Sequence, residues 1–175
     1  RQRAARRPVS IKVSDDDDTG KQVKSRYDHV VELKEWDRTV VREWDMRKHF
    51  DVDRNVLEDK RVQHAEADWF HINSFWYDEK EESLLVSGRN QGIAKVDMNN
   101  NLQWILAPHY QWGKAGPNGE GVDVNNHLLT AIDKNGQPFK DSVQLGVIPA
   151  KDFEWTYGQH NPMLLPNGNV FVMDN

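Results

Sequence analysis

The sequence predicts an all-β protein made of four-stranded antiparallel meanders, the repeating unit of β-propeller blades. Short apolar or alternating segments are separated by tight turns, and four of them follow one another within residues 69–106. The chain also holds 7 Trp in 175 residues, and an acid or amide precedes Trp in Glu43-Trp44, Gln103-Trp104 and Glu154-Trp155. Recurrent aromatics beside short strands are typical of repetitive β architectures.

Further strand-like segments cover residues 9–13, 27–34, 39–44 and 153–155, and an Asn-Gly turn predicts a small hairpin within residues 128–139. A segment as long as 107–152 between strands usually has a function or covers another part of the protein. The expected organisation is a tail and partial strand in 1–26, the end of one blade in 27–45, a connecting loop in 46–68, a complete blade in 69–106, a long loop insertion in 107–152, and the first strands of a truncated next blade in 153–175.

The composition argues against several classes of function. The net charge of −5 does not indicate general nucleic-acid binding. The basic cluster in residues 1–7 is expected to be a solvated tail. No apolar run approaches the roughly 20 residues that cross a membrane. The chain has no Cys, so it forms no disulfide, Cys-based zinc site or thiol nucleophile.

Two acidic segments resemble calcium sites only in part. The four Asp residues 15–18 fit a solvated loop, with a calcium-binding β-repeat as the alternative. Residues 51–55 imitate the start of an EF-hand loop, but its sixth position is Val56 instead of Gly and its twelfth is Val62 instead of Glu. We therefore expect no metal site, and no motif indicates a cofactor.

The central hairpin pairs two residues of chemical interest. Its strands, 69–78 and 83–89, flank an acidic turn centred near Lys80, and His71 and Arg89 lie at equal distances from that centre. Antiparallel pairing therefore brings an imidazole and a guanidinium together, with Cα atoms about 4.5–5.5 Å apart in a regular register. A β-bulge would shift this match by one residue.

A second hairpin repeats this order. His160 precedes an apolar strand, the Asn167-Gly168 turn and another strand, and aligning residues 84–86 with 170–172 places His160 near the position of His71. The first strand of a propeller blade lines the central channel, so we expect His71, His160 and Arg89 at one channel mouth. An Arg fork suits a tetrahedral oxyanion, and two His residues can supply a nucleophile and a proton donor or acceptor. This set suits group transfer of an anionic unit.

Other chemical candidates lack such support. Residues 88–92 do not contain the Lys-Ser/Thr of a phosphate-binding loop. Four aromatic residues are candidates for stacking on an aromatic substrate, with packing as the alternative for each: Trp76, Tyr110, Trp112 and Tyr157. The histidines without repeat support are expected to be ordinary hydrogen-bonded residues: His29, His49, His64, His109 and His127.

The motifs in residues 68–74, 87–91 and 158–160 occur in this order and precede the turn 166–169 and Asp174-Asn175. Together they resemble the bacterial arylsulfate sulfotransferases, over residues 27–175. The resemblance implies a six-bladed propeller, of which this chain holds about two blades, and sulfuryl transfer from an aryl sulfate donor to a phenol acceptor without a nucleotide. By motif it implies His160 as the transiently sulfated catalytic residue, His71 and Arg89 as catalytic sulfate-binding residues, and Asn73 as a substrate-binding neighbour.

The resemblance also implies a periplasmic or other extracytoplasmic location, and a further catalytic His on an earlier blade that no residue of this chain supplies. We therefore expect a fragment that is inactive alone and whose edge strands are covered by the rest of the parent or by another copy in a homo-oligomer. The alternative is a non-catalytic β-propeller module that binds a protein or a ligand.

Overall fold

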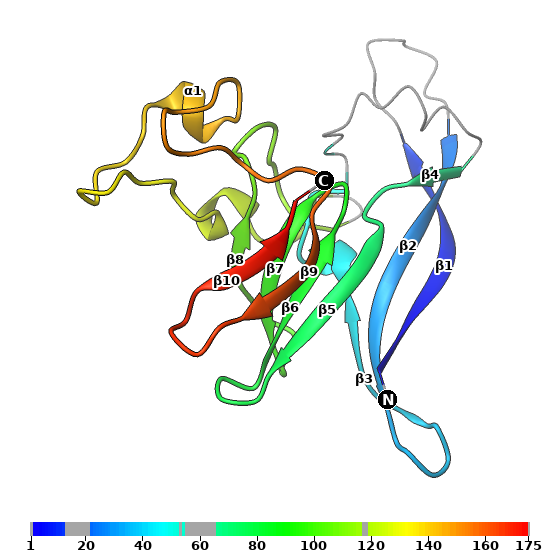
Figure 1. Ribbon diagram of the computed structural model, residues 1–175. Coiled ribbons are helices and arrows are strands. Elements are labelled where there is room, and N and C mark those ends of the chain that lie inside the picture. The colour runs from blue at the N-terminus through cyan, green and yellow to red at the C-terminus, as the bar shows by residue number, and fades with distance from the viewer. Residues whose placement is uncertain (1, 13–21, 53, 55–65, 117–118, 175) are drawn as a thin grey trace.

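The computed structural model describes residues 2–12, 22–52, 54, 66–116 and 119–174, and strands account for most of its regular structure (Figure 1). This confirms the all-β class. The described helices are all too short to cross a membrane. The strands are β1 (Gln2–Lys12), β2 (Gln22–Leu33), β3 (Val40–Asp45), β4 (Glu66–Asp68), β5 (Ile72–Asp78), β6 (Ser83–Gly88), β7 (Gly92–Asp97), β8 (Leu102–Leu106), β9 (His160–Leu164) and β10 (Val170–Met173); the helices are η1 (Met46–Lys48), η3 (Val124–His127) and α1 (Asp141–Gln144).

The first sheet extends into residues 1–26, where the sequence predicts a tail and a partial strand. β1 and β2 pair antiparallel along their length, β3 pairs with β2, and β4 joins β2 in parallel. The basic composition of the first residues suggested solvation, but strand pairing is made by backbone N–H and C=O groups, on which composition carries little information. The Asp run at 15–18 and most of the expected loop 46–68 lie outside the described residues.

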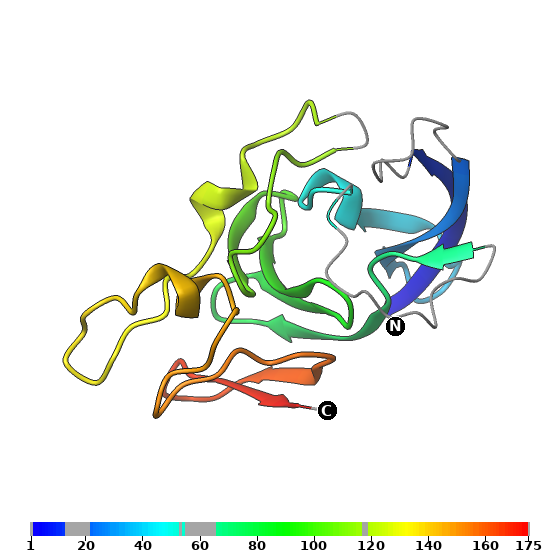
Figure 2. The ribbon, with the colours of Figure 1, turned by 90° about the horizontal axis from the view of Figure 1, so that it is seen from above.

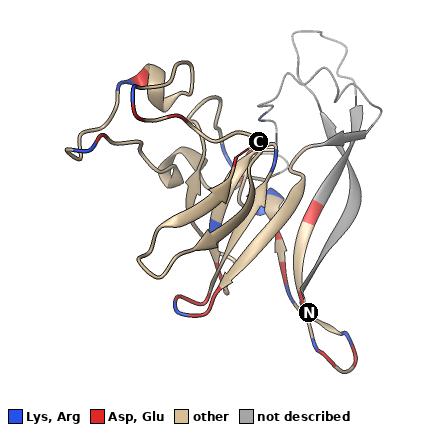
Figure 3. Cartoon of the chain, in the orientation of Figure 1, with Lys and Arg blue, Asp and Glu red and all other residues tan. Residues whose placement is uncertain are grey.

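The second sheet contains β5, β6, β7 and β8 in chain order, each antiparallel to the next. This is the four-stranded meander that the sequence predicts within residues 69–106. Every residue of the central strand β6 is buried, whereas the exposed turn between β5 and β6 carries charged residues (Figure 3). One core therefore joins this sheet to the segment from β2 to η1 and beyond, with buried residues that include Val30, Trp44, Met46, Phe50, Phe70, Leu84, Val86, Ala94 and Ile105.

The long insertion is mostly irregular and extends away from the β1–β2–β3 sheet, as Figure 2 shows. The hairpin predicted within 128–139 is reduced to a bridge between Ile132 and Pro138, and the strand predicted at 153–155 to a bridge between Ala150 and Phe153. The side chain of Gln144 replaces the missing strand partner. Its Oε1 accepts from the Ala131 N–H at 2.9 Å, and its Nε2 donates to the Ala131 carbonyl at 2.7 Å.

The third sheet is the β9–β10 hairpin, which packs β9 against β5. The buried Gln159, just before β9, joins the two sheets. Its Nε2 donates to the Gly88 carbonyl at 2.8 Å, and its own carbonyl accepts from Asn73 Nδ2 at 2.6 Å and from Ser87 Oγ at 3.1 Å. We call these three hydrogen bonds the Gln159 latch. They connect the start of β9 to the far end of the β5–β6 hairpin.

The close packing at Gly88 gives a test of the core. A Cβ at residue 88 would lie 2.4 Å from Cε1 of the fully buried Phe70. Gly88→Ala is therefore expected to lower the free energy of unfolding by about 1–3 kcal/mol, because Phe70 must leave its preferred position. Urea denaturation measures the change. Lys80→Ala in the exposed turn serves as control and should change stability by less than about 0.5 kcal/mol, so equal losses would contradict this packing.

The Gln159 latch gives a second test. Gln159→Leu removes the donor to the Gly88 carbonyl, although that carbonyl keeps a bond from the Gln91 N–H at 3.0 Å. The expected loss is about 1 kcal/mol, the net value of one hydrogen bond. Gln103→Leu, on an exposed position of β8, is the matched control. Unchanged urea midpoints in both variants would show that the side-chain bond of Gln159 does not contribute to stability.

Candidate functional site

The open end of the β5–β6 hairpin brings His71 and Arg89 together as the sequence predicts. The Arg89 N–H donates to the His71 carbonyl at 3.0 Å, and the Asn90 N–H donates to the Phe70 carbonyl at 3.3 Å. These bonds continue the ladder of β5 and β6 past the last paired strand residues. The two residues are therefore main-chain neighbours on opposite sides of one hairpin.

This match depends on a β-bulge. Asp78 pairs with Ser83 and Ser74 with Ser87, so an unbroken register would place Arg89 opposite Ile72. The bulge between Ile72 and Ser74 inserts one extra residue, Asn73, and Ile72 pairs with Gly88 instead. The turn centre thus lies half a residue beyond Lys80, and the bulge restores the partnership of His71 with Arg89.

His71 itself has an unusual backbone. Its φ of 56° lies in the left-handed region, which few residues other than Gly adopt. The next N–H, that of Ile72, donates at 2.7 Å to Oδ2 of Asp28, a buried carboxylate on β2. Asp28 therefore fixes the chain where it enters β5, and the conformation of His71 is set by contacts on both sides of it.

His160 begins β9 between two anchors to the same hairpin. The residue before it, Gln159, forms the Gln159 latch with β5 and β6. The residue after it, Asn161, donates its N–H to Ser74 Oγ at 2.8 Å. His160 is thus held beside β5 by its neighbours on both sides, and its partner across the sheet is Met173 on β10.

The four predicted site residues therefore share one region of the molecule. Arg89 is bonded to His71 through the main chain, and Asn73 is bonded to the residue that precedes His160. Arg89 is exposed, and His71, Asn73 and His160 are half-buried.

A shallow pocket opens beside Arg89. It is partly open to solvent and lies between residues 89–92, Pro108 and residues 156–159. Tyr157 is the one of the four stacking candidates that lines it. Its N–H donates to Asp174 Oδ1 at 3.0 Å, and its hydroxyl donates to the Gly146 carbonyl at 3.3 Å. Partial burial raises the pKa of Tyr157, so its phenol is neutral at pH 7.

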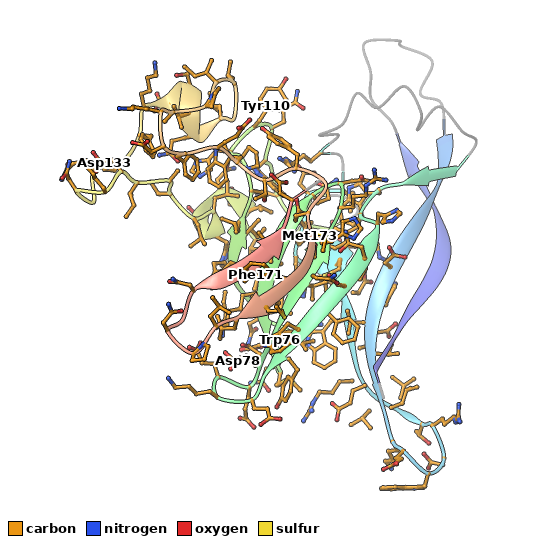
Figure 4. The ribbon with its side chains drawn as sticks, in the orientation of Figure 1. Trp76, Asp78, Tyr110, Asp133, Phe171 and Met173 are labelled. Atoms are coloured by element: carbon orange, nitrogen blue, oxygen red, sulfur yellow. The ribbon has the colours of Figure 1, made fainter. Side chains whose placement is uncertain are left out.

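The other stacking candidates lie elsewhere. Trp112 is buried, and its Nε1 donates to the Pro108 carbonyl at 2.7 Å, so it belongs to the packing behind the pocket. Trp76 lies towards the turn end of β5, whereas Tyr110 lies in the long loop at the opposite end of the molecule (Figure 4). The pattern of aromatic residues in the sequence did not distinguish these positions, because each is set by long-range packing.

One residue beside the pocket has no sequence signal. Arg54, within the failed EF-hand motif, is only 2% exposed and contacts the carbonyls of Gln91, Pro108 and Tyr110. Asp51 of the same motif accepts the Gly113 N–H at 2.8 Å through its Oδ2, while Asp53 lies outside the described residues. The described part of this acidic motif therefore has a structural role, as the acceptor of a main-chain N–H.

Three of the four described histidines outside the site are hydrogen-bonded, as expected, and His29 is the exception. His49 Nε2 lies 2.6 Å from Asn100 Oδ1, and burial lowers the pKa of His49. The Nδ1 atom of the buried His29 lies 2.8 Å from Glu43 Oε1, but neither ring nitrogen of His29 has a hydrogen bond of acceptable geometry. His109 and His127 bond to the main-chain carbonyls of Leu129 and Gln103, respectively, and His64 lies outside the described residues.

Comparison with known proteins identifies the family. The arylsulfotransferase (ASST) family model matches residues 9–175. The arylsulfate sulfotransferase AssT of Escherichia coli O6:H1 (strain CFT073) is 29% identical over 188 aligned residues, which cover 90% of this chain and 30% of that protein. The protein of the same name from Lelliottia amnigena is 33% identical over 111 residues, which cover 63% of this chain and 17% of the relative. The chain thus spans less than a third of the length of these relatives, and it belongs to the arylsulfotransferase family.

Proposed function

We propose that the protein carrying this chain moves a sulfuryl group from an aryl sulfate ester to a phenolic acceptor, through a sulfo-histidine on His160 and without a nucleotide donor. One observation carries the proposal: the Gln159 latch and the Arg89–His71 main-chain bond hold His71, Arg89 and His160 in one region. The names of the two relatives support the same reaction class.

The first half-reaction begins at the half-buried His160. A neutral ring nitrogen attacks the sulfur of the aryl sulfate in line, and the N–S bond forms as the S–O bond to the aryl group breaks. The leaving phenolate keeps the bonding electron pair. Its conjugate acid has an ordinary pKa near ~10, so a proton donor or the positive field of Arg89 assists its departure.

Arg89, His71 and Asn73 are proposed to hold the non-bridging sulfate oxygens. A guanidinium presents paired donors that match a tetrahedral oxyanion, and charge on these oxygens changes during transfer much as in phosphoryl transfer. A carboxamide nitrogen carries two hydrogens, and the Gln159 latch uses one of those on Asn73 Nδ2. The other is available to a sulfate oxygen.

In the second half-reaction, the oxygen of the acceptor phenol attacks the sulfur of the sulfo-histidine. The phenol loses its proton, the N–S bond breaks, and the electron pair returns to His160. The nucleophile is regenerated, and no reactant beyond the donor and acceptor is needed. The kinetics are therefore expected to be ping-pong.

The proposal extends to the parent architecture. The β5–β8 sheet would be one blade of a six-bladed ring, and β9–β10 would begin the next, so that the site lies between adjacent blades. The packing of β9 against β5 supports this arrangement. The 175-residue chain alone is then expected to be inactive, and a periplasmic location and coverage of its edges by the parent or by a second copy belong to the same proposal.

The nucleophile assignment is tested in the whole protein that carries this chain. After incubation with 4-nitrophenyl sulfate, mass spectrometry of the peptide bearing His160 should show one added sulfuryl group. His160→Ala should lose that adduct and at least about 10³-fold of the 4-nitrophenol release, because the substitution removes the proposed nucleophile.

His127→Ala provides the matched control. His127 is half-buried and has a main-chain contact, but it lies in η3 rather than beside the hairpin. Its substitution should leave both the adduct and the rate unchanged. Parental turnover by the His160→Ala protein, or an adduct on another peptide, would show that the nucleophile is wrongly assigned.

A further inference from the structure

Arg54 is a buried cation whose contacts in the described structure are to neutral groups. Its Nε donates to the Tyr110 carbonyl at 2.8 Å, and its Nη1 donates to Gln91 Oε1 at 3.0 Å. Its Nη2 donates to the Pro108 carbonyl at 3.3 Å, and the guanidinium carbon lies 3.7 Å from the centre of the Trp112 ring. These contacts satisfy the geometry of the guanidinium but do not neutralise its charge.

Arg54 has no direct ion pair in the described structure, although the charge of Asp51 favours its charged form. No carboxylate among the described residues forms an ion pair with it, and Oδ2 of the nearby Asp51 accepts from the Gly113 N–H. Burial lowers the pKa of Arg54 to about 9, so the group still carries its charge at neutral pH. A buried positive charge that no direct ion pair balances among the described residues favours a nearby anion.

The pocket beside Arg89 shares two lining residues with the surroundings of Arg54. Gln91 and Pro108, which accept from Arg54, both line that pocket. Gln91 also returns a bond, because its Nε2 donates to the Arg54 carbonyl at 3.1 Å. The guanidinium thus lies directly behind the pocket wall, and the exposed Arg89 lies on the wall itself.

We propose that Arg54 is a positioning residue for the sulfated substrate: it fixes the Gln91 and Pro108 wall and supplies a positive charge that favours an anion in the pocket. The identity of that anion as an aryl sulfate rests on the proposed function. The expected effect of Arg54 on the binding of inorganic sulfate does not rest on the proposed function, because it follows from the charge of Arg54 behind the pocket wall.

The test compares Arg54→Met and Arg54→Lys with the parent in the whole protein that carries this chain. Calorimetric titration with inorganic sulfate measures affinity without turnover. The Met variant, which has no charge, should bind sulfate roughly tenfold or more weakly, and the Lys variant, which keeps the charge, within about threefold of the parent. Arg42→Met is the matched control, because it removes one exposed positive charge that pairs with Glu32 at 2.6 Å on β2. It should bind sulfate like the parent.

Steady-state kinetics separate this role from a merely structural one. The Met variant should lose kcat/KM for the anionic donor 4-nitrophenyl sulfate and largely keep kcat/KM for a neutral phenol acceptor, with Lys restoring most of the loss. Equal weakening by Met and Lys, or no weakening by either, would overturn the proposal. Circular dichroism checks the fold of each variant.

Folding failure is also informative. If the Met variant does not fold, the Lys variant decides by its sulfate affinity, and if the Lys variant does not fold either, the role of Arg54 is structural and the proposal is wrong. A parent protein that binds no sulfate also overturns it. A parent that binds sulfate with the expected variant pattern but forms no sulfo-histidine would refute the proposed function and leave the role of Arg54 in anion binding intact.

Discussion

The Gln159 latch is the contact on which the arrangement of the site depends. Gln159 is buried, and a buried amide that lost its partners would cost about 1–3 kcal/mol, so the latch holds β9 in one position rather than merely against an apolar surface. Apolar contacts between sheets permit sliding, whereas three directed hydrogen bonds do not. The position of His160 relative to β5 is therefore fixed by hydrogen bonds of the residue before it, Gln159.

The molecule divides its stabilising contacts between the two ends of the β5–β6 hairpin. Along the strands, buried aliphatic and aromatic side chains form one core with the segment from β2 to η1. At the open end, polar contacts replace them: Asp28 bonds the chain beside His71, and Arg54 holds the pocket wall through Gln91. The core supplies most of the stability, and the polar end supplies the precise placement that chemistry requires.

Sequence patterns predicted what depends on local periodicity. The meander follows from strand-length apolar segments and turns. The spacing about the turn predicted the partnership of His71 with Arg89, but in the structure that partnership requires the bulge at Asn73. The Asn73 bulge, β1 and the role of Arg54 were not predictable in this way. The bulged residue Asn73 bonds Gln159 far along the chain, and the acceptors of Arg54 are 37–56 residues away from it, so no local pattern records either.

The bulge at Asn73 gives the two ends of the β5–β6 hairpin different pairing registers. A strand that gains or loses one residue normally turns every later side chain to the opposite face of the sheet. Here the unpaired position lies between the exposed turn and His71, so β5 already contains a point where one residue stands outside the ladder. A change in the length of the exposed turn therefore need not alter the pairing of His71 with Arg89 at the open end. The β5–β6 turn is thus a suitable place to insert a reporter peptide.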